Sequence, residues 1–124
     1  GLSLVTDVCV PISALSASIE KTKKAIEKSG LLAPIAGHVG DGNYHLMILF
    51  DGESEDGLSR AKSLASEVNE IALDFGGTVT GEHGIGSGKR SYMEREHGEA
   101  WSIMGNIKEL FDPNNIMNPG KLVP

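Results

Sequence analysis

Two histidines lie seven residues apart in the stretch "GHVGDGNYH" (37–45), and they are the side chains in this sequence best placed to do chemistry together. Asp-Gly is a favoured dipeptide at the centre of two-residue β-hairpin turns. If Asp41 and Gly42 form such a turn, His38 and His45 become directly opposed on neighbouring strands, with Cβ atoms about 5 Å apart. Two imidazoles so placed could chelate one metal ion. The alternative is that both are ordinary surface histidines.

A carboxylate in a second glycine-rich stretch, "TGEHGIGSGK" (80–89), supplies a candidate third ligand, Glu82. Two histidines and one carboxylate suit Zn²⁺, Mn²⁺ or Fe²⁺ and leave coordination positions open for a substrate. In a regular strand Glu82 and His83 would point to opposite faces of the sheet. We therefore expect Gly81 and Gly84 to let the backbone leave strand geometry at this point.

Composition narrows the class of protein. The 124 residues suffice for about one domain, and the shares of hydrophobic (40%) and charged (23%) residues are those of a soluble globular protein. A net charge of −6 argues against nucleic acid as the main partner. No apolar run approaches the roughly 18 residues that suggest a membrane span. Cys9 is the only cysteine, so no disulfide can form within the chain, and we expect a reducing, intracellular compartment.

The elements that must position these residues follow from hydrophobic periodicity and from the placement of glycine and proline. We predict strands over about 4–10 and on both sides of residues 41–42, and a fourth strand over "GTVTGEH" (77–83). Helices are predicted over about 13–29, 58–75 and 88–111, the last of them broken near Gly98.

The order of these elements predicts an α+β fold: a ferredoxin-like βαββαβ antiparallel sheet with both helices on one face, followed by a C-terminal helical segment, in a single domain over 1–124. Alternation along the strand after the turn places Tyr44, Leu46 and Ile48 towards the helices and the two histidines towards the open face. An uncovered sheet face needs a partner, either another domain or another chain. We expect that face to be able to drive self-association.

Three motifs in this order and spacing resemble the C-terminal part of the FAD-linked oxidase family. They are "GHVGDGNYH" (37–45), "GEHGIGSGKR" (81–90) and "FDPNNIMNPGK" (111–121), and "TDVCVPIS" (6–13) fits the same family. The family includes D-lactate dehydrogenase, the glycolate oxidase flavin subunit and D-2-hydroxyglutarate dehydrogenase. The resemblance spans nearly the whole chain and implies the C-terminal portion of a substrate domain. The FAD-binding domain of the family is expected to lie N-terminal to this region, outside this sequence.

Matched by position, the resemblance implies that His38, His45 and Glu82 are metal ligands, that His83 is the general base, and that Asn118 lies in the tail segment that approaches the flavin. The implied cofactors are FAD, bound mainly by the N-terminal domain, and a divalent metal, for which we expect Zn²⁺ or Mn²⁺ in preference to Fe²⁺. The implied reaction is oxidation of a D-2-hydroxy acid to the 2-oxo acid, in the bacterial cytoplasm or the mitochondrial matrix.

Met47 stands two residues after the second histidine, where family members acting on dicarboxylates can place a polar group. We therefore expect a short acid with an uncharged tail, such as lactate or glycolate. Two other classes remain open: a stand-alone ferredoxin-like module that binds metal or dimerises without turnover, and a non-haem iron oxygenase. The adjacency of Glu82 and His83 also leaves open that His83 is a fourth ligand and Glu82 the base.

Overall fold

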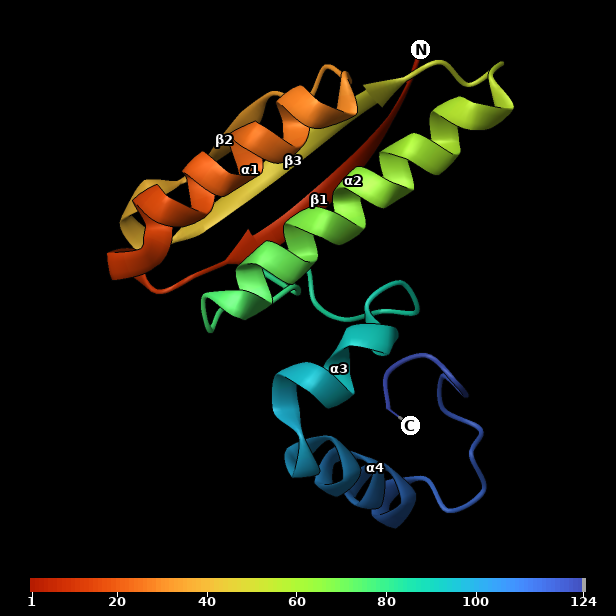
Figure 1. Ribbon diagram of the computed structural model, residues 1–124. Helices are drawn as coiled ribbons and strands as arrows, with labels where there is room; N and C mark the ends of the chain where they lie inside the picture. Colours follow the sequence, from red (N-terminus) through yellow and green to blue (C-terminus); the bar gives the residue numbers. More distant parts are fainter. Residues whose placement is uncertain (124) are drawn as a thin grey trace. The chain divides into compact units, whose positions relative to one another are not determined.

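A computed structural model describes residues 1–123, with the backbone alone at Val39 and Glu55. The chain divides into two units, Gly1–His83 and Gly84–Pro124, which we call the sheet unit and the helical unit (Figure 1). The predicted metal ligands and the predicted base all belong to the sheet unit, and Asn118 belongs to the helical unit. None of the helices within residues 1–123 combines the length and the apolar character that crossing a membrane requires.

The sheet unit is built on an antiparallel sheet of three strands. Across the sheet they run in the order β1–β3–β2, where β1 is Leu2–Cys9, β2 is Ile35–His38 and β3 is Asn43–Phe50. Helix α1 (Leu15–Ser29), which follows a short 3₁₀ turn (Ile12–Ala14), and helix α2 (Glu55–Asp74) cover one face of this sheet (Figure 1). The predicted α+β fold, with both helices on one face of an antiparallel sheet, is confirmed.

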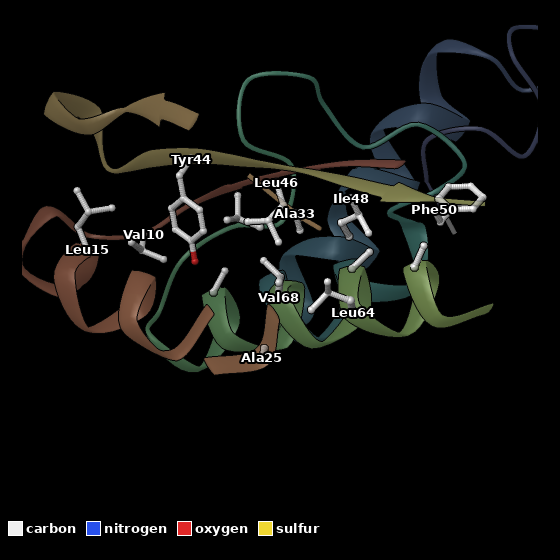
Figure 2. Packing of buried hydrophobic residues seen from close by; sticks show 14 residues of the cluster. Val10, Leu15, Ala25, Ala33, Tyr44, Leu46, Ile48, Phe50, Leu64 and Val68 are labelled. Carbon is white, nitrogen blue, oxygen red and sulfur yellow. The ribbon is translucent and has the colours of Figure 1, made fainter. Parts of the chain in front are cut away.

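The core lies between the sheet and the helices, and β3 supplies its centre. Tyr44, Leu46, Ile48 and Phe50 are buried, and the first three point towards the helices (Figure 2), whereas the residues between these four are less buried. This alternation confirms the side of β3 that the sequence assigned to the core. Helix α2 meets it with buried residues at helical spacing, namely Ala61, Leu64, Ala65, Val68 and Ala72.

Helix α1 is joined to the same strand by a polar contact inside the core. The Tyr44 hydroxyl lies 2.6 Å from Ser18 Oγ and 3.2 Å from Thr22 Oγ1, and all three side chains are buried. A buried hydroxyl without a partner is costly, so these contacts let α1 turn two polar side chains towards the sheet. The helix ends at Gly30, whose φ of 66° is the left-handed conformation typical of a helix C-terminus.

The predicted fourth strand over 77–83 does not form. Thr78 makes one isolated antiparallel bridge with Cys9, with N–O distances of 3.0 and 2.7 Å, and the chain then turns. Gly81, with φ of 47°, takes the backbone out of strand geometry just before the candidate ligand Glu82. Residues 79–83 therefore form a loop that passes beside the end of β1, and not the predicted fourth strand of the sheet.

The predicted register of the hairpin is also wrong, by two residues. His38 pairs with Asn43 and Ala36 pairs with His45, so the connection between β2 and β3 has four residues, a 3₁₀ turn over Val39–Asp41 followed by Gly42. Val10 N–H donates to the Gly42 carbonyl at 2.9 Å. A Cβ at Gly42 would lie 2.1 Å from the Val10 carbonyl oxygen. Gly42 therefore packs directly against the backbone of Val10, and the connection between β2 and β3 has four residues instead of the predicted two.

The helical unit contains α3 (Arg90–His97) and α4 (Glu99–Phe111), and the predicted break at Gly98 is confirmed. Two side-chain contacts hold the segment that follows α4. The Asp112 carboxylate accepts hydrogen bonds from the N–H groups of Ile116 and Met117, at 3.0 and 2.9 Å, and contacts the Lys108 ammonium. The Arg90 guanidinium donates to the carbonyls of Gly120 and Val123, each at 2.7 Å.

We predict that Asp112→Asn destabilises the helical unit at neutral pH and that this effect fades in acid. The hydrogen bond from Lys108, together with those from two backbone N–H groups, lowers the pKa of Asp112 from 3.8 to about 2 against the opposing effect of burial. Because folding favours the ionised carboxylate, its contribution is complete above the unfolded pKa and is lost as the pH falls through the folded one.

Urea unfolding followed by the fluorescence of Trp101, the only tryptophan, reports on the helical unit. The difference in stability between wild type and Asp112→Asn should be constant from about pH 7 to pH 5 and should shrink below about pH 4, as the wild-type carboxylate gains its proton. A difference of the same size at about pH 3 and pH 7 would contradict the assignment.

Candidate metal site on the open face of the sheet

The sheet face opposite α1 and α2, which we call the open face, carries the candidate ligands. In the β1–β3 ladder Asp7 pairs with His45 and Val5 pairs with Met47. Val5 is 56% exposed and Met47 is 49% exposed, whereas His45 is half-buried. The histidines therefore point away from the helices, as expected from the alternation along β3, and apolar side chains lie beside them.

His38 and His45 are diagonal neighbours on this face instead of a directly opposed pair. His38 pairs with Asn43, and His45 lies two residues further along β3 on the same face. A register error of two residues preserves the face of every side chain, whereas an error of one would have reversed it. The imidazole centroids are 6.1 Å apart, with ring planes at 89°. The two histidines come together as predicted, through a different pairing.

Glu82 joins the two histidines. Its Oε1 lies 3.4 Å from His45 Nε2 and 3.9 Å from His38 Nε2, and one ligand atom from each residue falls within 4.8 Å of the others. Ligand atoms bound at about 2.1 Å to a tetrahedral ion lie about 3.4 Å apart. The His45–Glu82 pair already has this spacing, and the His38–Glu82 pair needs only a small side-chain adjustment. The donor set fits a divalent ion.

The loop that carries Glu82 is held by a residue that the sequence reading missed, Asp7. Asp7 Oδ2 accepts hydrogen bonds from the N–H groups of Glu82 and His83, at 2.8 and 2.9 Å. At Gly81 a Cβ would lie 1.9 Å from Asp7 Oδ1, so the carboxylate occupies the place where any other residue would carry its side chain. This contact explains how Glu82 and His83 both reach the neighbourhood of His45.

Asp7 is 5% exposed and is satisfied on both oxygens. Its Oδ1 accepts a hydrogen bond from Asn43 Nδ2 at 2.9 Å and lies 3.2 Å from His45 Nδ1. Burial alone would raise the pKa of Asp7. The Asn43 amide, the N–H groups of His83 and Glu82, and the nearby His45 outweigh burial and hold the pKa below its ordinary value. Asp7 is therefore a buried, ionised carboxylate at neutral pH.

A sequence signal for Asp7 did exist. It is the one charged residue inside the valine-rich strand "LVTDVCV" (4–10), and a charged side chain in a buried strand requires a specific set of partners. Its role could not be recognised without the β1–β3 register, which places position 7 opposite position 45.

Two overlapping ligand sets share His45, namely His38–His45–Glu82 and Asp7–His45–His83. They use different nitrogens of His45, since Nε2 faces Glu82 and Nδ1 faces Asp7. Asp7 already accepts three hydrogen bonds and contacts His45, so its lone pairs are committed to protein donors. Glu82 is 55% exposed. The chemistry of the donors therefore favours His38, His45 and Glu82 as the metal ligands.

His83 lies beside this set. Its ring centroid is 5.8 Å from that of His45, its Nε2 is 3.7 Å from Glu82 Oε1, and its side chain is 68% exposed. Asn118 is in the helical unit, where it adopts a φ of 46° and lines a cavity of about 730 Å³ together with Lys108, Asp112 and Lys121.

The sequence is similar to a known protein family and to several known relatives. The model of the family "FAD linked oxidases, C-terminal domain" matches residues 1–122. D-lactate dehydrogenase [cytochrome], mitochondrial, from Arabidopsis thaliana is 48% identical over 98% of this chain and 22% of its own length. Probable D-lactate dehydrogenase, mitochondrial, from Danio rerio is 46% identical over 95% of the chain and 24% of its own length.

Glycolate oxidase subunit GlcD from Bacillus subtilis is 35% identical over 97% of the chain and 26% of its own length. The chain thus spans about a quarter or less of the length of these relatives. Because the family model covers nearly all of the sequence, the chain belongs to the family of FAD-linked oxidase C-terminal domains.

Proposed function

We propose that this chain is the metal- and substrate-binding part of a flavin-dependent dehydrogenase that oxidises a D-2-hydroxy acid to the 2-oxo acid. The observation that carries the proposal is the convergence of His38, His45 and Glu82 on the open face, with His83 beside them. The relatives named D-lactate dehydrogenase and glycolate oxidase subunit support the class of reaction.

Oxidation of a hydroxy acid requires the hydroxyl proton to leave as the C–H bond breaks. When bound, a divalent ion lowers the pKa of the substrate hydroxyl, and FAD accepts the two electrons. His38, His45 and Glu82 would hold the ion on the open face, so that the substrate would be oriented beside these residues and His83. We expect Zn²⁺ or Mn²⁺ in preference to Fe²⁺.

We propose His83 as the group that accepts the hydroxyl proton at a ring nitrogen. Imidazole is the side chain best suited to proton transfer at physiological pH. His83 is exposed and adjacent to the ligand set, and Asp7 fixes its backbone N–H, so its ring stands beside the place where a bound hydroxyl would lie. Its proximity to Glu82 also makes it the candidate fourth ligand, an alternative that the metal content of His83→Ala tests.

The substrate class follows from the neighbours of the ligands. Val5 and Met47 form the next pair along the β1–β3 ladder, and Ala36 is opposite His45 on β2. These apolar side chains suit a short uncharged tail better than a second carboxylate, because a carboxylate placed beside them would lose its hydration without gaining a partner. We therefore propose a lactate-like or glycolate-like acid.

The remaining partners are proposals of the same kind. FAD would be held mainly by an N-terminal domain of the longer protein, and Asn118 would lie in the tail segment that approaches the flavin. That domain would also cover the open face, whose apolar residues Val5, Met47 and Leu49 are exposed here. Where the face is left uncovered, it would drive self-association. The proposed compartment is the bacterial cytoplasm or the mitochondrial matrix.

We predict that His38→Ala and His45→Ala each weaken binding of Zn²⁺ or Mn²⁺ by at least about 10-fold, about 1.4 kcal/mol, because each removes a direct ligand. Isothermal titration of the full-length protein with each metal salt measures this. His97→Ala is the matched control, since His97 is the remaining histidine and lies in α3, where it contacts Glu96. Metal affinity that is unchanged in both ligand variants would contradict the site.

A second prediction separates the ligand from the base. In the full-length enzyme Glu82→Ala should lose metal, whereas His83→Ala should keep metal and lose about 10²–10⁴ in kcat, the usual cost of removing a general base. Metal analysis and steady-state kinetics of the two purified variants, side by side, give the answer. If His83→Ala is purified without metal, His83 is a ligand and the roles proposed here are wrong.

A further inference from the structure

The carboxylate of Asp7 accepts three hydrogen bonds and contacts His45, yet the proposed chemistry does not itself use it. Asp7 is buried at the end of β1 and faces two different parts of the ligand set at once. We propose that Asp7 is a positioning residue that fixes the tautomer of His45, so that Nδ1 carries the proton and Nε2 presents its lone pair to the metal. This inference rests on the metal site of the proposed function.

The position of His45 Nδ1 indicates which ring nitrogen carries the proton. Nδ1 lies 3.2 Å from Asp7 Oδ1. An ionised carboxylate can only accept hydrogen bonds, so a bare nitrogen lone pair at this distance would face another lone pair. A proton on Nδ1 removes that repulsion and leaves Nε2, the nitrogen 3.4 Å from Glu82 Oε1, unprotonated. Metal ligands of this type commonly have their second ring nitrogen held by a carboxylate or carbonyl.

Several hydrogen bonds hold the Asp7 carboxylate in its position beside His45. Its carboxylate is held by Asn43 Nδ2, which also donates to the Val8 carbonyl at 3.1 Å, and by the N–H groups of residues 82 and 83. The β1–β3 ladder fixes its backbone directly opposite His45. Asp7 cannot turn away from His45 without breaking these bonds. One carboxylate therefore orients a ligand imidazole and positions the backbone of a second ligand, Glu82.

Asp7→Asn is a nearly isosteric change with a definite consequence. The N–H groups of Glu82 and His83 can only donate, so the new amide must keep its oxygen towards them and turn its NH₂ group towards His45. Asn43 can adapt by reversing its own amide, which gives its Oδ1, buried and unpartnered in the described structure, a donor but breaks its hydrogen bond to the Val8 carbonyl. His45 can adapt only by moving its proton from Nδ1 to Nε2, the nitrogen that the metal needs.

The test is the tautomer of His45 together with metal affinity. In full-length protein labelled with ¹⁵N-histidine, kept free of metal at alkaline pH, the ring ¹⁵N shifts of His45 should report a protonated Nδ1 in the wild type and a protonated Nε2 in Asp7→Asn. The affinity for Zn²⁺, measured by isothermal titration, should fall about 10- to 100-fold in the variant.

Asp112→Asn is the matched control. Asp112 is also a buried carboxylate that accepts hydrogen bonds from two backbone N–H groups, but it contacts Lys108 and the turn after α4, and none of these partners is a proposed metal ligand. This control should lose stability while leaving the His45 shifts and the affinity for Zn²⁺ unchanged. A loss of affinity that appears equally in both variants would reduce the Asp7 effect to general destabilisation and overturn the proposal.

The wild-type spectrum is decisive even where Asp7→Asn fails to fold, because a protonated Nε2 in the wild type overturns the proposal directly. An Asp7→Asn variant that folds and keeps both the wild-type tautomer and the wild-type affinity overturns it as well. Failure of the wild type to bind any divalent metal would contradict the proposed function. The tautomer measurement on metal-free protein would still decide the role of Asp7.

Discussion

The contact between the Asp7 carboxylate and the backbone of residues 82 and 83 is the interaction on which the geometry of the site depends. Together with the contacts of Asp7 to Asn43 and His45, it joins three segments distant in sequence: β1, which carries Asp7, β3, which carries His45, and the loop that carries Glu82. Burying a carboxylate is expensive unless donors surround it, and here the Asn43 amide and two backbone N–H groups supply them. The same donors hold the loop against the sheet without a fourth strand.

The two faces of the sheet differ in composition: one is packed into the core and the other carries the candidate ligands. On the helix side, the alternating residues of β3 and the apolar stripe of α2 form a closed core. On the open face the same strands present His45, Met47 and Leu49, and β2 adds His38. Because alternate residues along one strand point to opposite faces, the residues that build the core also fix where the candidate ligands point. The site is thus placed on rigid elements, apart from the loop that Asp7 holds.

Periodic features could be predicted from the sequence and features set by tertiary contacts could not. The stripe of α2, the alternation of β3 and the break at Gly98 are local patterns, and all three are confirmed. The predicted strand over 77–83 does not form, because Gly81 turns the chain towards Asp7. Asp7 is about 75 residues away in the sequence, so no local pattern reveals this contact. The predicted hairpin register was wrong because Gly42 packs against Val10, a contact that the Asp-Gly dipeptide does not indicate. The predicted proximity of His38 and His45 holds despite both errors, since the shift of two residues kept them on one face.

Anomalous diffraction tests most directly whether His38, His45 and Glu82 hold a divalent ion on the open face. Crystals of the full-length protein grown with Mn²⁺ or Zn²⁺ should show one anomalous peak there. It should lie about 2.0–2.3 Å from Nε2 of His38, Nε2 of His45 and a carboxylate oxygen of Glu82. A peak bound instead by Asp7, Nδ1 of His45 and His83, or a map without a peak on this face, would contradict the account.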